Sequence, residues 1–330
     1  MAICGDPDVA QHGASLTRMR AHPGYSRRGD CRDCLAPELA VQLAVNIVVL
    51  ASIYALIACG YVLIYRVSRV LNLAHGELMM LGAYLVLATA SLFSDHPAIA
   101  LVVAVLLSVV VGALVYVLLM RKMTGEMVLA AILTTVALGI LIRGLAILIW
   151  SAQQQYPAQA LGVANPSIAI VGAARISLWS AVLVLVTVAV YGALFAFLRF
   201  SRWGMRMRAA GQNALLAGQR GINLHAVYAL AWSLSTLTGS LAGILISVDS
   251  GITTSMPVIG LKAFPAALVG GLDSVIGAIA GSLIVAAAEV LLIYYIDPLL
   301  SDVVPFLVLI AMLVLRPWGL FGTREELDRV

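Results

Sequence analysis

The sequence predicts an all-α integral membrane protein, a polytopic helical bundle of about eight or nine transmembrane segments. Two observations support this fold class. Charged residues make up only 11% of the 330 residues and hydrophobic residues 62%, whereas a soluble domain has roughly 25% charged residues. Long apolar runs also recur along the chain with arginine-bearing loops between them, which excludes a soluble protein built around one large core.

The apolar runs follow one another from residue 39 to residue 315. Most are long enough for a helix to cross a hydrocarbon core of about 30 Å. The run 257–271 is shorter and contains Lys262 and Pro265, so it predicts a broken or re-entrant helix buried within protein. In chain order, the runs cover residues 39–65, 73–93, 98–120, 127–150, 176–198, 224–248, 257–271, 274–296 and 303–315.

Polar segments divide the chain outside these runs. Residues 1–38 form a polar, turn-rich N-terminal tail without the apolar core of a signal peptide, and we expect this tail to be disordered. Residues 39–322 form the membrane domain, and residues 323–330 form a C-terminal tail. Cys31 and Cys34 make a single CxxC without a second pair, which is a weak metal signal. We therefore predict no metal site.

The distribution of positive charge predicts the orientation in the membrane. If the polar loop at 199–223 is cytoplasmic and the nine runs alternate, twelve arginines and lysines fall in cytoplasmic segments and one, Arg175, in an outer loop beyond the tail. This asymmetry follows the positive-inside rule, although five arginines in the tail oppose it. We expect the N-terminus outside the cytoplasm and the C-terminus inside it.

The sequence excludes several function classes. It contains two lysines, Lys122 and Lys262, and neither lies in the GK[ST] of a P-loop. It contains no HExxH or GxSxG motif, and its scattered aromatic residues do not support nucleic-acid binding. We therefore predict no catalytic residues and no bound cofactor. Any energy from ATP must come from another subunit.

Two ionisable residues inside apolar runs have matching depths. Arg143 lies seven residues before Trp150, where its run ends, and Glu289 lies seven residues before Ile296, where its own run ends. Both of these ends face outward in the predicted orientation. Because an ionisable group at membrane depth is costly unless it is paired or faces water, we predict an intramembrane ion pair between Arg143 and Glu289.

A polar cluster opens the second apolar run, in the segment LNLAHGELMMLGAY. Residue chemistry alone suits Asn72 as a helix N-cap and Glu77 at the positive end of a helix dipole. Small residues in this segment would equally suit a pore-lining broken helix. The glycine-rich segment at 269–282 predicts tight packing around another turn at depth. The candidates for a translocation path are Asn72, His75, Gly76, Glu77, Gly270 and Gly271.

The loop at 199–223 is the long polar interruption in the second half of the chain. Small residues fill its middle, and Gly221 closes it as a helix C-cap would. Its residues fit two interpretations equally well: a solvated positive-inside loop, or a cytoplasmic helix that docks on a partner. It holds no acidic residue and five arginines: Arg199, Arg202, Arg206, Arg208 and Arg220.

Three stretches resemble the branched-chain amino acid ABC transporter permease family, most closely the H-type permease of the leucine/isoleucine/valine importer. They are SIYALIACGYVLIYRVSRVLNLAHGELMMLGAY (52–84), GLKAFPAALVGGLDSVIGAIAGSLI (260–284) and RPWGLFG (316–322). With the loop at 199–223, the resemblance covers about residues 39–322. It implies a multi-pass permease subunit of an ATP-driven importer in a bacterial inner membrane, while the long N-terminal tail and the lead GMRMRAAGQ depart from the family pattern.

The resemblance also implies partners. These are a second related permease or a second copy of this chain, two cytoplasmic ATPase subunits that bind ATP and magnesium, a periplasmic binding protein, and membrane lipid, but no nucleic acid. It implies an ATPase-coupling region at 206–223, in which we expect arginines to make rim contacts and small residues to make the coupling contact. The positions that match are Arg206, Ala210, Asn213, Ala217, Gly221, Ile222 and Asn223.

Three alternatives stay open at this point, and the third is a membrane scaffold or receptor subunit, which no appended soluble domain favours. Urea or short amides are alternative substrates, because related permeases share much of the AHGELMM region, whereas the stretch at 260–274 favours amino acids. A secondary transporter or channel would need no ATPase. Its expected sign is a membrane carboxylate that couples to ions, and Glu289 alone offers thin support.

Overall fold

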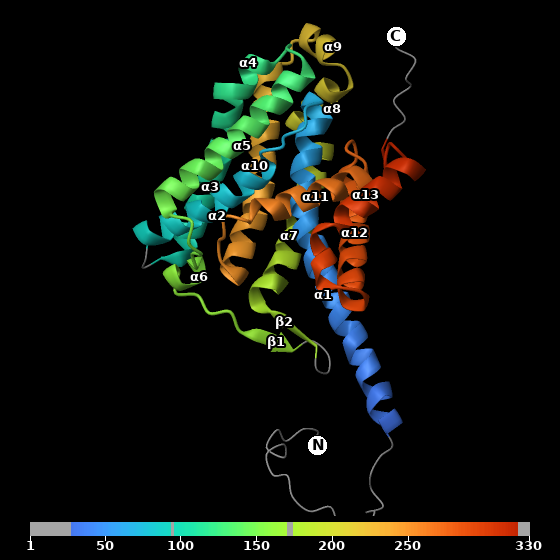
Figure 1. The fold of residues 1–330 in the computed structure, drawn as a ribbon. Coiled ribbons are helices and arrows are strands. Elements are labelled where there is room, and N and C mark those ends of the chain that lie inside the picture. The colour runs from blue at the N-terminus through green and yellow to red at the C-terminus, as the bar shows by residue number, and fades with distance from the viewer. Residues whose placement is uncertain (1–27, 94–95, 170–173, 323–330) are drawn as a thin grey trace, which may run out of the picture.

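The computed structural model describes residues 28–93, 96–169 and 174–322, which form a helical bundle with one small β-hairpin (Figure 1). Within these residues, seven helices are long and apolar enough to cross a membrane. Two shorter apolar helices, α11 (Pro257–Gly270) and α13 (Val304–Leu315), accompany them. The chain is therefore a polytopic helical membrane protein, as the sequence predicts.

The remaining elements follow the predicted runs closely. In chain order they are α1 (Arg28–Ser68), α2 (His75–Leu92), α3 (Pro97–Val115), the π-helical turn η2 (Tyr116–Met120), α4 (Arg121–Met123), α5 (Val128–Trp150), α6 (Pro157–Ala160), β1 (Ser167–Ala169), β2 (Arg175–Ser177), α7 (Leu178–Phe200), α8 (Arg202–Gln212), α9 (Ala214–Gln219), α10 (Leu224–Ser250), α12 (Val275–Tyr295) and the 3₁₀ turn η3 (Pro298–Asp302).

Helix α1 begins earlier than the apolar run that predicts it. The helix starts at Arg28, so the last part of the predicted disordered tail at 1–38 is helical. Hydropathy marks where a chain leaves an apolar layer, but backbone hydrogen bonding can continue beyond that point. Residues 1–27 lie outside the described residues, as do the side chains of Cys31 and Cys34.

The polar segments 151–177 and 249–256 meet at one end of the bundle. β1 and β2 pair there as an antiparallel hairpin, and Gln155 forms an isolated bridge with Ile252. Asp249, near the end of α10, accepts hydrogen bonds from the hydroxyls of Ser177 at 2.6 Å and Ser180 at 3.0 Å. These contacts tie the end of α10 to the hairpin and to the start of α7.

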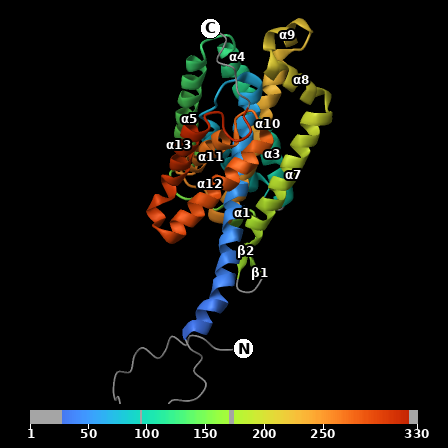
Figure 2. The ribbon, with the colours of Figure 1, turned by 90° about the vertical axis from the view of Figure 1, so that its right-hand side faces the viewer.

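Two sets of four helices make matching contacts. Helix α1 packs against α11 and α12, as α10 packs against α2 and α3. Helix α2 contacts α5, as α11 contacts α13. Helices α1 and α10 run in opposite directions through the centre of the molecule (Figures 1 and 2). The sets α1, α2, α3, α5 and α10, α11, α12, α13 are therefore inverted repeats, an arrangement that many membrane transporters share.

Helices α2 and α11, which are equivalent in the two repeats, cross closely in their first turns. A Cβ atom on Gly76 would lie 2.6 Å from the carbonyl oxygen of Pro257, and a Cβ atom on Gly260 would overlap the Cα atom of Gly76. Both contacts involve backbone atoms that cannot move aside as a flexible side chain can. Glycine is therefore required on both sides of the crossing, because any side chain would separate the two helices.

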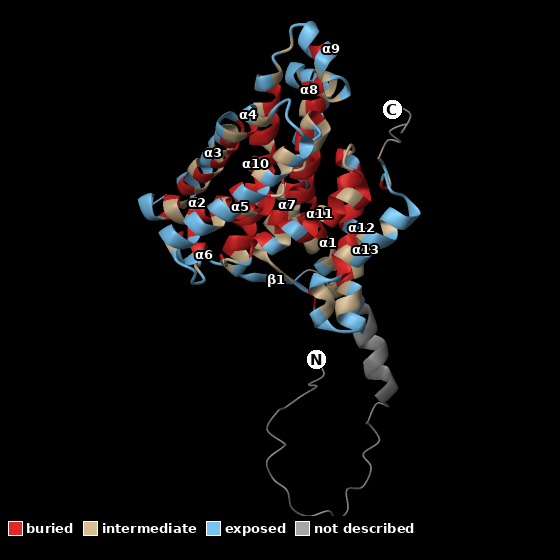
Figure 3. Ribbon diagram, turned by 45° about the horizontal axis from the view of Figure 1, so that its top comes forward, coloured by how far each residue is buried: buried red, intermediate tan, exposed pale blue. Residues whose placement is uncertain are grey.

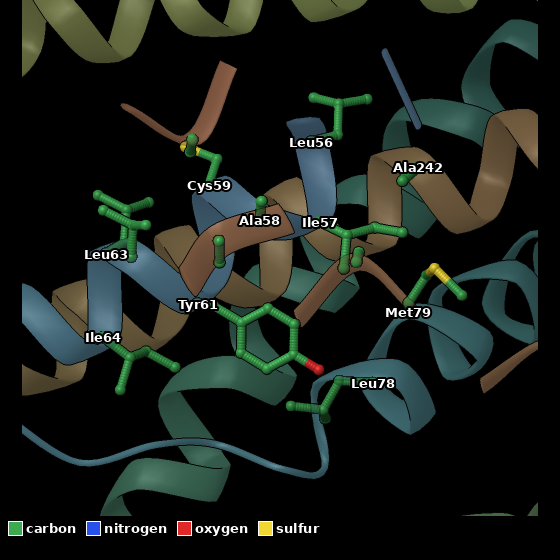
Figure 4. Packing of buried hydrophobic residues seen from close by; sticks show 14 of the residues in the cluster. Leu56, Ile57, Ala58, Cys59, Tyr61, Leu63, Ile64, Leu78, Met79 and Ala242 are labelled. Atoms are coloured by element: carbon green, nitrogen blue, oxygen red, sulfur yellow. The ribbon is translucent and has the colours of Figure 1, made fainter. Parts of the chain in front are cut away.

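The core of the molecule lies where α1, α2 and α10 meet (Figures 3 and 4). Tyr61, Leu78, Met79 and Ala242 from these helices are buried together. Helices α3, α5 and α7 bury much less of their apolar surface. Their outer faces are therefore free to contact lipid chains or a second membrane subunit.

We predict that Gly260→Ala destabilises the protein by about 1–3 kcal/mol, the usual cost of overpacking a well-packed site. The added methyl group would overlap the backbone of α2 at Gly76. Thermal unfolding of the detergent-solubilised protein measures the effect. The matched control is Gly192→Ala in α7, where nothing lies within 4 Å of the added atom; that variant should be neutral or gain up to about 1 kcal/mol. Equal stability of the two variants would contradict the tight crossing.

Candidate functional site

A charged pair lies near the middle of α5 and the start of α2. Nη2 of Arg143 donates to Oε1 of Glu77 at 2.9 Å. Gly139, one turn before Arg143, faces the same carboxylate, and a Cβ atom there would lie 3.1 Å from it. The Arg143 side chain is 43% exposed and that of Glu77 is 15% exposed. A charge at this depth is costly against lipid, so this face of the chain requires water or another protein surface beside it.

A second polar network joins α11, α12, α1 and η3. Lys262 donates to Oε1 of Glu289 at 3.3 Å and to the Ser301 hydroxyl at 2.9 Å, and it pairs with Asp302 at 2.7 Å. The Tyr54 hydroxyl donates to Oε2 of Glu289 at 2.6 Å. Glu289 is almost fully buried. Its charge is stabilised by one cation and by hydrogen bonds to both oxygens, as a buried carboxylate requires.

The predicted ion pair between Arg143 and Glu289 is wrong. The structure pairs Arg143 with Glu77 and Glu289 with Lys262. The two residues have matching depths, but they lie on helices of different repeats, and each helix turns its charge toward a neighbour in its own repeat. Depth along a helix does not determine which way a side chain points. Lys262 was visible in the sequence as a lone lysine in an apolar run, but that run offered no sign of its partner.

Most of the path candidates around α2 are enclosed by protein. His75 is fully buried, its ring centroid lies 4.7 Å from that of Tyr61, and its Nδ1 lies 3.4 Å from the Ser235 hydroxyl. Asn72 is also buried, and its Oδ1 accepts the backbone N–H of Ala74 at 3.1 Å. This bond precedes the helix, which begins at His75, so Asn72 is not the N-cap of α2.

The path candidates Gly270 and Gly271 mark a packed turn between α11 and α12. A Cβ atom on Gly270 would overlap the backbone of Gly277, and one on Gly271 would lie 2.5 Å from the backbone nitrogen of Gly322. Gly271 also has φ +102°, where side chains are strained. The tight packing predicted for 269–282 is therefore confirmed. Gly76, which is packed against α11, adds no open surface, and Glu77 is the path candidate with a partly exposed side chain.

The loop at 199–223 folds into α8 and α9, and side-chain caps define each helix start. The Ser201 hydroxyl accepts the N–H of Gly204 at 2.9 Å at the start of α8. Asn213 caps α9 by accepting the N–H of Leu216 at 3.0 Å, and Asn223 caps α10. Such caps satisfy backbone donors that would otherwise lack partners. Asn213 and Asn223 therefore set the two bends of this segment.

Gly221 ends α9 in the left-handed conformation that glycine favours. Its φ is +80°, and the following residue, Ile222, donates its N–H back to the carbonyl of Ala217 at 3.1 Å. This hydrogen-bond pattern closes a helix and reverses the chain. Gly221 directly follows the C-cap Arg220 and closes α9 as the sequence predicts. Nothing lies within 4 Å of a Cβ atom placed there.

Two of the small residues expected to make the coupling contact, Ala210 in α8 and Ala217 in α9, face the chain itself. Ala210 and Ala217 are 3% and 5% exposed, and Gly211 packs against the carbonyl oxygen of Arg66 at the end of α1. These residues let the two helices lie close to α1 and α10. They are therefore not exposed for the partner contact that we expected of them.

Two leucines of α9 are exposed instead, and sequence reasoning missed them. Leu215 is 72% exposed and Leu216 is 56% exposed. Two adjacent leucines in a short polar helix were the available signal. Arg206 on α8 is also exposed, and its guanidinium lies 4.8 Å from the Trp203 ring centroid. This end of the molecule presents apolar and cationic side chains side by side.

The arginine-bearing segments gather at one end of the bundle. Helices α4, α8 and α9 lie at that end, and β1, β2 and α6 lie at the opposite end (Figure 1). Arg121 and Lys122 fall in α4, and Arg202 and Arg206 fall in α8, whereas Arg175 falls in β2. The segments with many positive charges and the loop with one therefore lie at opposite ends of the molecule.

Comparison with a family model and with individual relatives identifies the same kind of protein. The family described as "Branched-chain amino acid transport system / permease component" matches residues 43–313. The high-affinity branched-chain amino acid transport system permease protein LivH of Escherichia coli (strain K12) is 32% identical over 311 residues, covering 88% of this chain and 97% of the relative. The corresponding permease BraD of Pseudomonas aeruginosa is 28% identical over 307 residues, covering 88% and 98%. The protein named "Probable branched-chain amino acid transport permease protein LivH" of Methanocaldococcus jannaschii is 26% identical over 295 residues, covering 83% of this chain and 90% of the relative.

We predict that a double-mutant cycle couples Lys262 to Glu289 and leaves Arg143 and Glu289 independent. Lys262→Ala should cost about 3–5 kcal/mol, because it leaves Glu289 buried without its cation. The Lys262→Ala/Glu289→Ala cycle should show a coupling energy of at least about 1 kcal/mol, and Arg143→Ala/Glu289→Ala should be additive within about 0.5 kcal/mol. Unfolding of the purified protein in mixed detergent provides the free energies. The reverse outcome would contradict the observed pairing.

Proposed function

This chain belongs to the family of branched-chain amino acid transport system permease components, and we propose that it forms the membrane path for branched-chain amino acids in an ATP-driven importer. The observation that carries the proposal is the family match across residues 43–313. That stretch contains both inverted repeats except the start of α1 and the last residues of α13. The relatives named above are transport permeases for branched-chain amino acids, which favours these substrates over urea or short amides.

A permease component is the non-catalytic part of such a system, so the remaining tasks belong to partners. Two cytoplasmic ATPase subunits would bind ATP and magnesium, and a periplasmic binding protein would deliver the substrate. A second related permease, or a second copy of this chain, would complete the membrane unit. The exposed apolar faces of α3, α5 and α7 offer surface for that subunit and for lipid.

The end with α4, α8 and α9 is the cytoplasmic end in this proposal. It carries most of the arginines outside the tail, and the positive-inside rule favours that placement. The chain then starts outside the cytoplasm and ends inside it. The binding protein would dock at the opposite end, on the segments 151–175 and 249–256 that Asp249 and the hairpin hold together.

Glu77 and Arg143 are the residues that we assign to the path. They lie near the middle of the bundle and carry opposite charges, and the Arg143 side chain is nearly half exposed. An amino acid is a zwitterion, so its carboxylate can bind the guanidinium while its ammonium group binds the Glu77 carboxylate. The helix N-termini of α2 and α11 meet beside this pair, as half-helices do at transporter sites. Asn72, His75 and Gly76 hold α2 in place.

The coupling contact lies on the outer surface of α8 and α9. Leu215 and Leu216 would enter a groove on the ATPase, and Arg206 would meet an acidic rim. Asn213, Gly221 and Asn223 fix the bends that present this surface, while Ala210, Ala217 and Ile222 pack it against the rest of the chain. Because α8 contacts both α1 and α10, movement of this segment reaches the first helix of each repeat.

We predict that the purified chain, reconstituted with its ATPase and binding-protein partners, imports labelled leucine only when ATP is supplied. Arg143→Gln should lower the kcat/KM of uptake by about 10- to 100-fold, because it removes a charge-assisted hydrogen bond of about 1.5–3 kcal/mol. Unlabelled isoleucine and valine should compete, and urea should not.

The control for this experiment is Lys122→Gln, which removes an exposed charge in α4 and should leave uptake unchanged. Uptake driven by an ion gradient without ATP would contradict the importer. Normal uptake by the Arg143→Gln variant would remove Arg143 from the path and leave the importer assignment in place.

We predict that the double substitution Leu215→Ser, Leu216→Ser weakens binding of the ATPase by at least about tenfold. Burial of two leucines at an interface contributes on the order of 1.5–3 kcal/mol each. Affinity measured by biolayer interferometry with the permease in nanodiscs tests this. Leu299→Ser, at an 87% exposed leucine of η3, is the matched control and should not change affinity. Undiminished ATPase binding by the double variant would place the coupling contact elsewhere.

A further inference from the structure

An open cavity of about 680 Å³ lies beside α8, between the ends of α1 and α7 and the start of α12. Three arginines line it. Arg66 lies in the last turn of α1, Arg199 lies in the last turn of α7, and Arg208 reaches the cavity from α8. These positions are at the level where two apolar helices give way to the polar end of the bundle.

The cavity has an excess of positive charge. None of its three arginines has a carboxylate partner among the described residues. The acidic side chain at its edge, Asp273, is already paired with Arg69 at 2.8 Å. The first turn of α12 also lines the cavity, through residues 274–276. A helix N-terminus attracts anions through its backbone N–H groups and dipole. Apart from Asp273, the charged features of this wall therefore favour an anion.

The other wall of the same cavity is apolar. Phe195, Phe200 and Ile276 line it and are 51%, 76% and 58% exposed. Phe195 lies more than one helical turn before the end of α7, on the side of the arginines that faces the apolar layer. A soluble anion would leave these side chains uncovered, whereas a hydrocarbon chain would cover them.

We propose that this cavity binds an anionic phospholipid, with its phosphodiester headgroup on the three arginines and its acyl chains along the apolar wall. Arginine binds phosphate through two parallel hydrogen bonds, and basic pockets between transmembrane helices are typical headgroup sites. The bound lipid would bridge α8 to α1 and α12. It would therefore hold the helix that precedes the exposed leucines of α9 in a fixed position against both repeats.

The inference does not depend on which substrate the chain transports. Native mass spectrometry of the full chain, released from nanodiscs of phosphatidylglycerol and phosphatidylcholine in equal amounts, tests it directly. The wild-type protein should retain phosphatidylglycerol in preference to phosphatidylcholine. The triple variant Arg66→Gln, Arg199→Gln, Arg208→Gln should reduce the retained phosphatidylglycerol by at least about tenfold. Equal retention of the two lipids by the wild-type protein would overturn the proposal.

A matched triple variant separates the cavity from general surface charge. Arg121→Gln, Arg202→Gln, Arg220→Gln removes the same number of exposed arginines from the same end of the chain, at positions that do not line the cavity. This variant should retain phosphatidylglycerol like the wild type. An equal loss of lipid in both triple variants would overturn the cavity assignment in favour of nonspecific attraction.

Two further measurements distinguish loss of lipid binding from misfolding, and a lipid from a soluble anion. Replacing the three cavity arginines by lysine keeps their charge and should preserve most of the binding even where the glutamine variant folds poorly. Thermal stability of the wild-type protein should rise with phosphatidylglycerol and stay constant with inorganic phosphate or glycerol phosphate at equal concentration. Stabilisation by the soluble phosphates alone would show an anion site without a lipid, which contradicts the proposal.

Discussion

Two helices that begin in the buried interior of the bundle set the arrangement around them. The first N–H groups of any helix lack partners within that helix, and no lipid can supply them. Helices α2 and α11 both start in the interior, so protein must enclose both starts. Glycines at 76 and 260 let the two first turns touch, and α1 and α10 enclose them from either side. The enclosed His75, the small residues around it and the inverted pairing of the repeats all follow from this requirement.

The sequence was sufficient to predict where most membrane helices lie, but not which side chains of different helices contact one another. Hydropathy predicted most spans within a few residues, whereas the short run at 257–271, expected to be broken or re-entrant, forms the single continuous helix α11 in the interior. The predicted ion pair was wrong because Arg143 and Glu289 were matched by depth alone. The direction in which each charge points depends on the rotation of its helix, and both charges point to a partner within their own repeat. The start of α1 was predicted too late in the chain for a related reason. Hydropathy indicates the surroundings of a helix and not the extent of its backbone hydrogen bonding.

The segment 199–223 shows the same limit in another form. Its closing glycine was predicted from the sequence, because this kind of helix end depends on residues a few positions apart. The faces of α8 and α9 were not, because small residues suit contacts within a chain as well as contacts between chains. The fold turned Ala210 and Ala217 inward and left Leu215 and Leu216 outside. Whether such a residue packs within the chain or can contact a partner depends on its exposure, and no local sequence pattern specifies that exposure.

The pairing of charges inside the bundle also determines how the protein responds to membrane voltage. Moving one unpaired charge across 100 mV changes the free energy by about 2.3 kcal/mol. Glu77 travels with Arg143, and Glu289 travels with Lys262, so each pair carries no net charge when its helices shift. A zwitterionic cargo adds none. An electric field across the membrane would therefore do little net work on these two pairs if each moved as a unit.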